Sequence, residues 1–358
     1  MNNLQHRIQH LLDQLVADGT ERGVQVALYF QGQLVVDAYA GVANINTGEK
    51  VTSQTLFPVF SATKGMAATI AHRLVERGLF GYETPIATLW PEFAAHGKEG
   101  ITVRHALNHT SGLPLVPLDV TPADFNDWDS MCRKIAAMKP ISAPGERTEY
   151  HAVTFGHIVG EVACRATGKT FPQLWHEELT LPLHLGNEMF CGLPENVSVP
   201  VAWLEEPEPP CPEAPAEPTA EAIPFWIWPL SDWMNKPESQ RAVVPASTGI
   251  MTAHALARHY AALLPSGVEG VELLSPARLQ TVLAPQPPTQ KRDDNDDGFF
   301  LGFAKFNGGF GHPGYGGSLG LANAEEGWAF GFAHNLFTES KSSQLILDEV
   351  KAALATAL

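Results

Sequence analysis

The segments of this chain that favour β-strands lie near its two ends, and the long stretch between them favours helices. Two runs of β-branched and aromatic residues, 24–31 and 34–40, are joined through Gln31-Gly32-Gln33, which predicts a hairpin. Further strands are predicted near the end of the chain, at residues 299–306, 318–323 and 328–333. If both ends build one sheet, the middle must be inserted into it as a separate lobe.

This arrangement predicts an α+β protein with two lobes. Apolar residues at helical spacing predict helices at both termini, over residues 4–16 and 340–358, as well as through the middle of the chain. We assign residues 1–81 and 240–358 to a sheet-containing lobe and residues 82–239 to an all-helical lobe. A catalytic cleft is expected between two such lobes.

Residues 194–224 are rich in Pro and Glu and contain no Lys or Arg, so they predict a long surface loop. The whole chain carries 39 acidic against 23 basic side chains, a net charge of −16. That balance argues against nucleic acid or an acidic membrane surface as a partner, because both are bound through clustered Lys and Arg. The acidic loop also predicts that anionic substrates are disfavoured.

The apolar stretches of the sequence are too short to span a bilayer. Residues 1–19 have polar residues at regular intervals and lack the unbroken apolar core of a secretory signal, so we expect a cytoplasmic protein. The four cysteines have no CxxC spacing, which favours reduced thiols over a disulfide framework or a zinc site: Cys132, Cys164, Cys191 and Cys211.

An SxxK tetrad, Ser61-Ala62-Thr63-Lys64, stands at the start of a helix predicted over residues 61–78. Residues i and i+3 share a helix face, so the Lys64 amine can reach the Ser61 hydroxyl. A lysine whose pKa is lowered can activate a serine as a nucleophile, and the helix N-terminus offers N–H groups to an oxyanion. The alternative is a serine that caps the helix, followed by an exposed lysine.

Four segments, in this order, resemble the penicillin-recognising serine hydrolases. The sequence around the tetrad, residues 57–65, is similar to that family's nucleophile segment, and residues 101–114 are similar to its L-L-x-H-T-S-G-L stretch. Pro144-Gly145-Glu146 followed by Tyr150 resembles the second catalytic element, and residues 311–318 resemble the third. The family includes class C β-lactamases, DD-carboxypeptidases and, most similar to this chain, the family VIII carboxylesterases.

The resemblance implies a β-lactamase-like fold, in which an antiparallel sheet is flanked by the N- and C-terminal helices and carries an inserted helical lobe. It implies that Ser61 is the nucleophile, Lys64 its partner and Tyr150 a third catalytic group, a general acid and base whose pKa neighbouring cations must lower before it can act as a base. The backbone N–H groups of Ser61 and Tyr315 would form the oxyanion hole. His312, with Gly314, would contact the substrate in place of the family's K-T-G lysine, as a donor whose charge depends on pH. No metal or organic cofactor is implied.

One departure from the family pattern favours esters as substrates. The family's Y-x-N element reads Tyr150-His151-Ala152, so the amide that would contact a β-lactam or a peptide is missing. We therefore expect a serine carboxylesterase that acts on small-molecule esters through an acyl-enzyme. An acyltransferase, a β-lactamase or D-amino-acid amidase, and a non-catalytic ligand-binding relative stay open as alternatives, as does the oligomeric state.

Other patterns in the sequence have competing interpretations. Residues 316–320 match the GxSxG nucleophile elbow, but we expect a glycine-rich turn because no βα alternation surrounds them. His105 and His109 could bind a metal ion, and residues 293–298 resemble the start of a calcium loop; packing and a solvated turn are preferred. An aromatic cluster could line a substrate pocket or pack the helical lobe: Trp203, Phe225, Trp226, Trp228 and Trp233.

Overall fold

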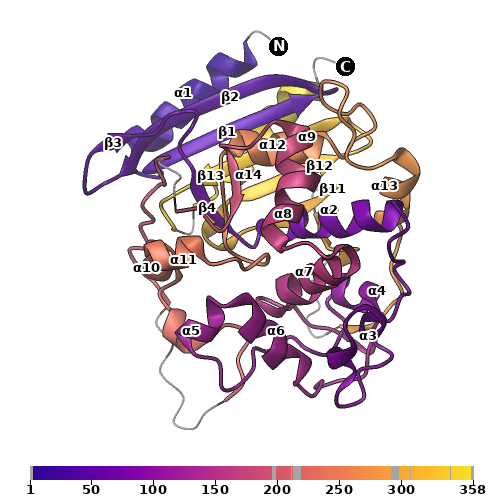
Figure 1. The fold of residues 1–358 in the computed structure, drawn as a ribbon. Coiled ribbons are helices and arrows are strands. Elements are labelled where there is room, and N and C mark those ends of the chain that lie inside the picture. Colours follow the sequence, from indigo (N-terminus) through magenta and orange to yellow (C-terminus); the bar gives the residue numbers. More distant parts are fainter. Residues whose placement is uncertain are drawn as a thin grey trace.

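An eight-stranded antiparallel sheet forms one half of the fold (Figure 1). The computed structural model describes residues 3–195, 199–210, 212, 219–291, 298–306, 308–338 and 340–355. The order of strands in the sheet is β3-β2-β1-β13-β12-β11-β10-β9. The strands are β1 Gly23–Phe30, β2 Gln33–Asn44, β3 Glu49–Lys50, β9 Phe299–Phe300, β10 Phe303–Phe306, β11 Gly309–Pro313, β12 Leu319–Asn323 and β13 Trp328–His334.

The centre of the sheet joins the two ends of the chain. β1 pairs with β13 in a continuous antiparallel register from Val24 opposite His334 to Phe30 opposite Trp328. The two flanking helices, α1 (Leu4–Ala17) and α14 (Ser342–Ala355), form one hydrophobic cluster with the side chains on one face of these strands. The predicted antiparallel sheet between terminal helices is therefore confirmed.

Both faces of the central strands are buried. Along β1, Val24, Val26 and Leu28 pack towards α1, whereas Ala27 and Tyr29 belong to the larger core on the opposite side, as the two-residue period of a strand requires. On that second face lies α12 (Ala253–Ala261), which approaches β13 so closely that a Cβ on Gly331 would lie 2.1 Å from the Ala253 carbonyl oxygen.

Helix α2 (Thr63–Glu76) contacts strands β10 and β11 of the sheet as well as other helices, and 12 of its 14 residues are buried. The remaining helices are α3 Ile86–Leu89, α4 Val103–Leu107, α5 Pro122–Phe125, α6 Trp128–Ala136, α7 Thr154–Thr167, α8 Phe171–Trp175, α9 Leu181–Leu183, α10 Leu230–Met234, α11 Pro237–Arg241 and α13 Pro276–Val282, with the short turns η1 Pro91–Ala94, η2 His176–Thr180, η3 Phe225–Ile227 and η4 Tyr315–Gly317.

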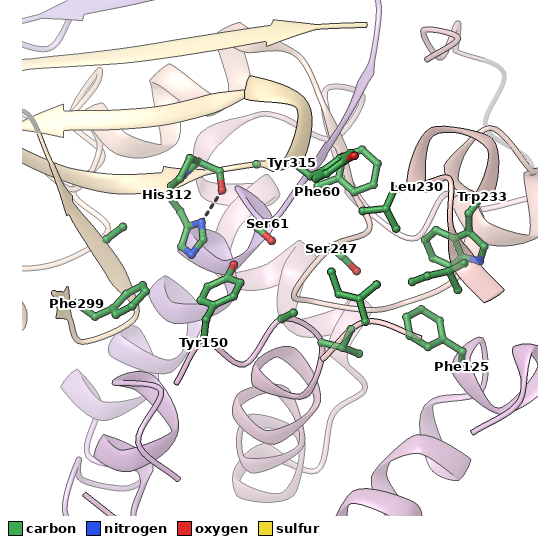
Figure 2. A pocket seen from close by; sticks show the side chains of 17 residues that line it. Phe60, Ser61, Phe125, Tyr150, Leu230, Trp233, Ser247, Phe299, His312 and Tyr315 are labelled. Carbon is green, nitrogen blue, oxygen red and sulfur yellow. Dashed lines mark hydrogen bonds between the residues drawn. The ribbon is translucent and has the colours of Figure 1, made fainter. Parts of the chain in front are cut away.

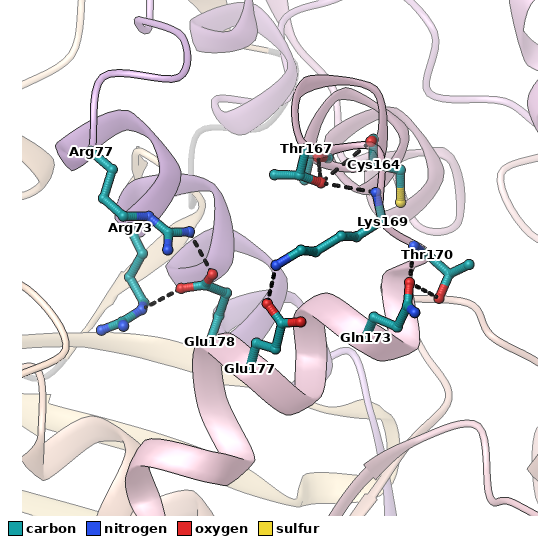
Figure 3. Close-up of polar contacts among 10 residues, drawn as sticks. Arg73, Arg77, Cys164, Thr167, Lys169, Thr170, Gln173, Glu177 and Glu178 are labelled. Atoms are coloured by element: carbon teal, nitrogen blue, oxygen red, sulfur yellow. Dashed lines mark hydrogen bonds and ion pairs between the residues drawn. The ribbon is translucent and has the colours of Figure 1, made fainter.

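The C-terminal half of α2 is tied to η2 by a buried carboxylate (Figure 3). Glu178 accepts hydrogen bonds from Arg73 Nε at 2.9 Å and from Arg77 Nη2 at 2.5 Å, and its side chain is only 3% exposed. A carboxylate this deeply buried needs both cations, since an unpaired charge would cost several kcal/mol (about 3–5). The ion pairs therefore fix α2 against the helical half.

The structure differs from the sequence prediction at several elements. Among the helices expected through the middle of the chain, the apolar stretch over residues 123–138 forms two helices, α5 and α6, because Asp127 caps a new N-terminus at α6. β11 was not predicted, since Gly309 and Gly311 are poor strand formers; a Cβ on Gly311 would lie 2.1 Å from the Gly320 carbonyl oxygen.

Short strands also occur within the stretch that was expected to be all-helical. β6 (Met189–Cys191) pairs with β7 (Gly249–Met251), which pairs with β4 (Phe57–Phe60), and β5 (Arg147–Thr148) pairs with β8 (Gln290–Lys291). The lobe boundaries at residues 81 and 240 stay a prediction.

Among the described residues, no helix has the length and apolarity that a membrane span requires. Cys132, Cys164 and Cys191 are free thiols. Cys211 lies outside the described residues, as do residues 196–198 and 213–218 of the acidic loop and residues 293–297 of the calcium-loop candidate.

Five buried histidines make the fold sensitive to acid. Burial lowers the pKa to about 3 for His72, His259 and His312, and to about 4 for His151 and His157. These folded-state values lie below the unfolded value of about 6.5, so below pH 6.5 the unfolded chain takes up protons that the folded chain does not.

We therefore predict that the free energy of unfolding falls as the pH decreases from 6.5 towards 4, by about 2 kcal/mol per histidine between pH 7 and pH 5. Urea denaturation followed by circular dichroism at several pH values measures this slope. His259→Phe removes one titrating group and should make the slope shallower; an unchanged slope in this variant would contradict the explanation.

Candidate active site

Ser61 lies in the tight turn between the buried strand β4 and helix α2 (Figure 2). Phe60, the residue before it, has a φ of +44°, which is costly for an aromatic residue and is typical of functional turns. Thr63 holds the turn, since its hydroxyl donates to the Phe60 carbonyl and accepts a hydrogen bond from the Gly249 N–H at 2.8 Å. The Ser61 side chain consequently faces a cavity.

The Lys64 amine is completely buried beside Ser61. Its Nζ lies 3.1 Å from Ser61 Oγ, 2.8 Å from the Ala152 carbonyl oxygen and 2.9 Å from that of Ala246. Burial lowers the pKa of Lys64 well below its usual value. In a neutral amine, two N–H groups donate to the two carbonyls and the lone pair faces the Ser61 hydroxyl, so the amine can accept a proton from it.

The interpretation of the tetrad as a helix cap is wrong. Ala62, not Ser61, occupies the N-cap position of α2, and no side chain caps this helix. Lys64, which that alternative expected at the surface, has no exposed area. The tetrad is thus arranged as a serine with a buried amine.

Tyr150 lines the same cavity, and its ring centroid lies 4.7 Å from Lys64 Nζ. We expected neighbouring cations to lower the pKa of Tyr150, but desolvation in the cavity raises it, although 38% of the residue is exposed, and the interaction with the Ser61 hydroxyl only partly opposes the rise. Burial also lowers the pKa of the neighbouring Lys64, His109 and His312, which disfavours their cationic forms. A protonated phenol is suited to donate a proton.

His312 lies at the end of β11 and its ring is almost completely buried. Its Nδ1–H donates to the Pro313 carbonyl at 2.7 Å, which fixes the proton on Nδ1 in the neutral ring. Burial, followed by the charge of Lys64, lowers the pKa to about 3. Nε2, which makes no hydrogen bond with any described residue, is therefore an acceptor and not the donor that we expected.

The loop that carries Gly314 and Tyr315 packs directly against the strand that leads to Ser61. A Cβ on Gly314 would lie 2.1 Å from the Val59 carbonyl oxygen, so only glycine permits this approach. The Tyr315 ring packs edge-on against Phe60, and its hydroxyl donates to the Glu206 carboxylate. These contacts bring the backbone of Tyr315 close to that of the nucleophile turn.

A cavity of about 360 Å³ opens at Ser61. Figure 2 shows Tyr150, His312 and Phe299 on one side of Ser61, and Ser247, Leu230, Trp233 and Phe125 on the other. Leu230, Trp233 and Phe125 make the second side apolar, and Val153, Ile223 and Ile227 add to the apolar lining of the cavity. Trp233 packs edge-on against Phe125, with ring centroids 5.3 Å apart.

The two interpretations of the aromatic cluster, pocket lining and packing, each hold for some of its members. Trp233 lines the cavity and Trp228 packs against Tyr315, whereas Trp226 packs behind Phe125. Trp203 and Phe225 are each 38% exposed and are not part of the cavity lining. Sequence reasoning missed Phe125, Ser247 and Phe299, which come from separate segments and carry no local pattern.

The remaining candidates have structural roles. Ser318 is completely buried and is followed by strand β12, so the GxSxG match is not a nucleophile elbow. His105 Nδ1 bonds to Thr102 in the cap of α4, and His109 Nδ1 accepts a hydrogen bond from the His151 N–H at 3.0 Å. The described residues contain no cluster of three or more His, Cys, Asp or Glu side chains that could hold a metal ion.

The chain belongs to the Beta-lactamase family, whose model matches residues 8–355, and is therefore a serine hydrolase of the β-lactamase type. The esterase/beta-lactamase LipL of Mycobacterium tuberculosis is 34% identical over 87% of this chain and 77% of its own length.

Two solved structures agree with this placement. A family VIII carboxylesterase is 29% identical, with a TM-score of 0.85 over 98% of this chain and 97% of the other. EstA from Arthrobacter nitroguajacolicus is 27% identical, with a TM-score of 0.86 over 98% and 96%.

We predict that Lys64→Met slows the reaction of Ser61 with a fluorophosphonate probe by about 100-fold or more, because the serine loses its base. Lys98→Met is a matched control, since Lys98 is equally buried and donates to the carbonyls of Ala95, Ala136 and Met138, but to no serine. It should lower stability and leave the labelling rate unchanged. Equal labelling rates in the two variants would contradict the role of Lys64.

Proposed function

We propose that this chain is a serine carboxylesterase that hydrolyses small neutral esters through an acyl-enzyme. The observation that carries the proposal is the buried Lys64 amine, 3.1 Å from the hydroxyl of Ser61, at the mouth of a cavity with apolar walls. The similarity to LipL and to the family VIII carboxylesterase supports the same reaction.

In the proposed reaction, Ser61 Oγ attacks the ester carbonyl while its proton moves to the Lys64 amine. The backbone N–H groups of Ser61 and Tyr315 stabilise the oxyanion. The Tyr150 phenol donates its proton to the leaving alcohol oxygen and recovers one from Lys64. The alcohol departs and the acyl-enzyme remains. Water then attacks the acyl carbon, with Lys64 and Tyr150 accepting its proton and returning one to Ser61 Oγ. The carboxylic acid is released and the Ser61 hydroxyl is regenerated.

Two features favour esters over β-lactams and peptides. Ala152 offers no amide to the substrate, and its side chain is part of the cavity wall. His312 stands where the resembling enzymes have a lysine; with its pKa lowered to about 3 it is uncharged at neutral pH and cannot pair with a carboxylate. An ester is not affected by the missing amide or the missing cation, because the oxyanion hole and a proton for the leaving alcohol are the polar contacts that its reaction uses.

The acidic loop supports a preference for neutral substrates. Glu206, on this loop, accepts the hydrogen bond of the Tyr315 hydroxyl, which places a carboxylate beside a cavity residue. A carboxylate there repels an anionic substrate, most strongly at low ionic strength. A cytoplasmic location and the absence of a cofactor belong to the proposal as expectations from the sequence.

A β-lactamase activity is the second candidate, since the esterase LipL is also named as a β-lactamase. An acyltransferase needs an acceptor alcohol that competes with water, and nothing in the cavity favours one. A D-amino-acid amidase shares only the fold with this chain, at 21% identity. A non-catalytic relative is least supported, because Ser61, Lys64 and Tyr150 all meet at one cavity.

We predict that p-nitrophenyl butyrate is hydrolysed with a kcat/KM at least about 100-fold higher than that of a chromogenic cephalosporin or of D-phenylalanine amide, because the polar partners of those substrates are missing. Steady-state assays with the three substrates measure the ratio. Ser61→Ala should remove all three activities. A cephalosporin that reacts faster than every ester would contradict the argument from Ala152 and His312.

We predict that Trp233→Ala shifts the preferred acyl chain of p-nitrophenyl esters to greater length, because it removes the indole that ends the apolar side of the cavity. Each additional buried methylene is worth about 0.8 kcal/mol, or roughly a fourfold gain in kcat/KM. Trp226→Ala is the control, since Trp226 packs against Phe125 but is not part of the cavity lining, and it should leave the chain-length profile unchanged. Identical profiles in both variants would place the acyl chain elsewhere.

A further inference from the structure

A buried glutamate–histidine pair lies behind the loop of Tyr315, outside the cavity. Glu21 precedes β1 and His334 ends β13, and their exposed fractions are 1% and 2%. His334 Nδ1 lies 2.9 Å from Glu21 Oε2, and His334 Nε2 lies 2.7 Å from the Gly316 carbonyl oxygen. The Ser340 hydroxyl donates to the second oxygen of Glu21 at 3.2 Å.

The partners of the pair determine which way its protons point. The Gly316 carbonyl can only accept a hydrogen bond, so His334 must carry a proton on Nε2. A second proton lies between Nδ1 and Glu21, whichever of the two holds it. Glu21 therefore fixes the ring so that the Nε2–H is directed at Gly316.

Two peptide planes connect the hydrogen bond between His334 and the Gly316 carbonyl to the Tyr315 N–H. The peptide between Gly316 and Gly317 is held on its carbonyl side by His334, and its N–H donates to the Gly314 carbonyl at 3.1 Å. The Gly314 carbonyl and the Tyr315 N–H belong to the same planar trans peptide and point in opposite directions. Fixing the carbonyl of Gly314 therefore fixes the direction of the Tyr315 N–H.

The loop is closed by a hydrogen bond from the Gly314 N–H to the Ser318 carbonyl at 2.7 Å, but the two residues that flank the Gly316 carbonyl peptide are glycines. Gly316 and Gly317 have φ values of +83° and +119°, so both lie in a region that glycine enters and leaves easily. A Cβ on Gly317 would lie 2.9 Å from His334 Nε2, which shows how closely the ring is seated against the loop. Tyr315 is anchored separately, through the bond of its hydroxyl to Glu206.

We propose that Glu21 and His334 are positioning residues for the oxyanion hole: they orient the Tyr315 N–H and touch no substrate. The inference rests on the proposed function, since it concerns the donor that stabilises the oxyanion. Loss of the pair affects the transition state, in which the oxygen is charged, more than the bound ester.

Two substitutions of His334 separate positioning from folding. The amide nitrogen of Gln reaches the place of Nε2, whereas that of Asn reaches only the place of Nδ1. His334→Gln therefore keeps the bond to Gly316 and should retain kcat for p-nitrophenyl butyrate to within about threefold, while His334→Asn should lower kcat by about tenfold or more at nearly constant KM. Inhibition by an alkyl boronic acid, whose serine adduct is tetrahedral, should weaken in parallel in His334→Asn.

The chain offers a matched control in a second Glu–His pair. His254 Nδ1 lies 2.8 Å from Glu188 Oε2, and its Nε2 lies 2.9 Å from the Tyr29 hydroxyl, but this pair is not linked to the Tyr315 loop. His254→Asn should leave kcat and boronate affinity unchanged.

Equal kcat in His334→Gln and His334→Asn, or an equal loss in His254→Asn, would overturn the proposal for the pair. A wild-type chain that hydrolyses no ester would instead contradict the proposed function, so the two failures are distinguishable.

Discussion

The site depends on the hydrogen bonds that surround the buried amine of Lys64. An ammonium group removed from water loses several kcal/mol of hydration, so the fold must surround it with acceptors or leave it neutral. Here the carbonyls of Ala152 and Ala246, from two segments distant in sequence, take two of its hydrogen bonds. Lys98 satisfies the same requirement with three carbonyls. At Lys64 the Ser61 hydroxyl takes the third position, and this difference from Lys98 is what the proposed reaction uses.

The groups around Ser61 are driven towards their neutral forms by the same burial. The pKa values of Lys64, His109 and His312 are lowered and that of Tyr150 is raised. Each of these shifts favours the neutral form of the group, so the field around Ser61 changes most when the oxyanion forms. The neutrality of His312 and the absence of an amide at Ala152 therefore act in the same direction on substrate choice.

The sequence predicted those features that depend on local spacing. The hairpin at Gln31-Gly32-Gln33, the terminal helices and the proximity of Ser61 to Lys64 follow from periodicity, and the resemblance added the order of the later segments. Prediction failed where tertiary contacts decide: Ser247 and Phe125 reach the cavity from unrelated segments. The pKa of Tyr150 was misjudged because it is set mainly by desolvation of the phenol in the cavity, which depends on tertiary contacts that the sequence does not show.

The pairing of β1 with β13 has a consequence beyond the sheet. Because the first and last strands are neighbours, Glu21, just before β1, lies beside His334 at the end of β13, 313 residues later in the sequence. From there two peptide planes lead to the Tyr315 N–H. A chain whose ends met elsewhere would have to anchor that glycine-rich loop by other means, since Gly316 and Gly317 supply no rigidity of their own. Sheet topology and oxyanion geometry are thus linked through one buried ring.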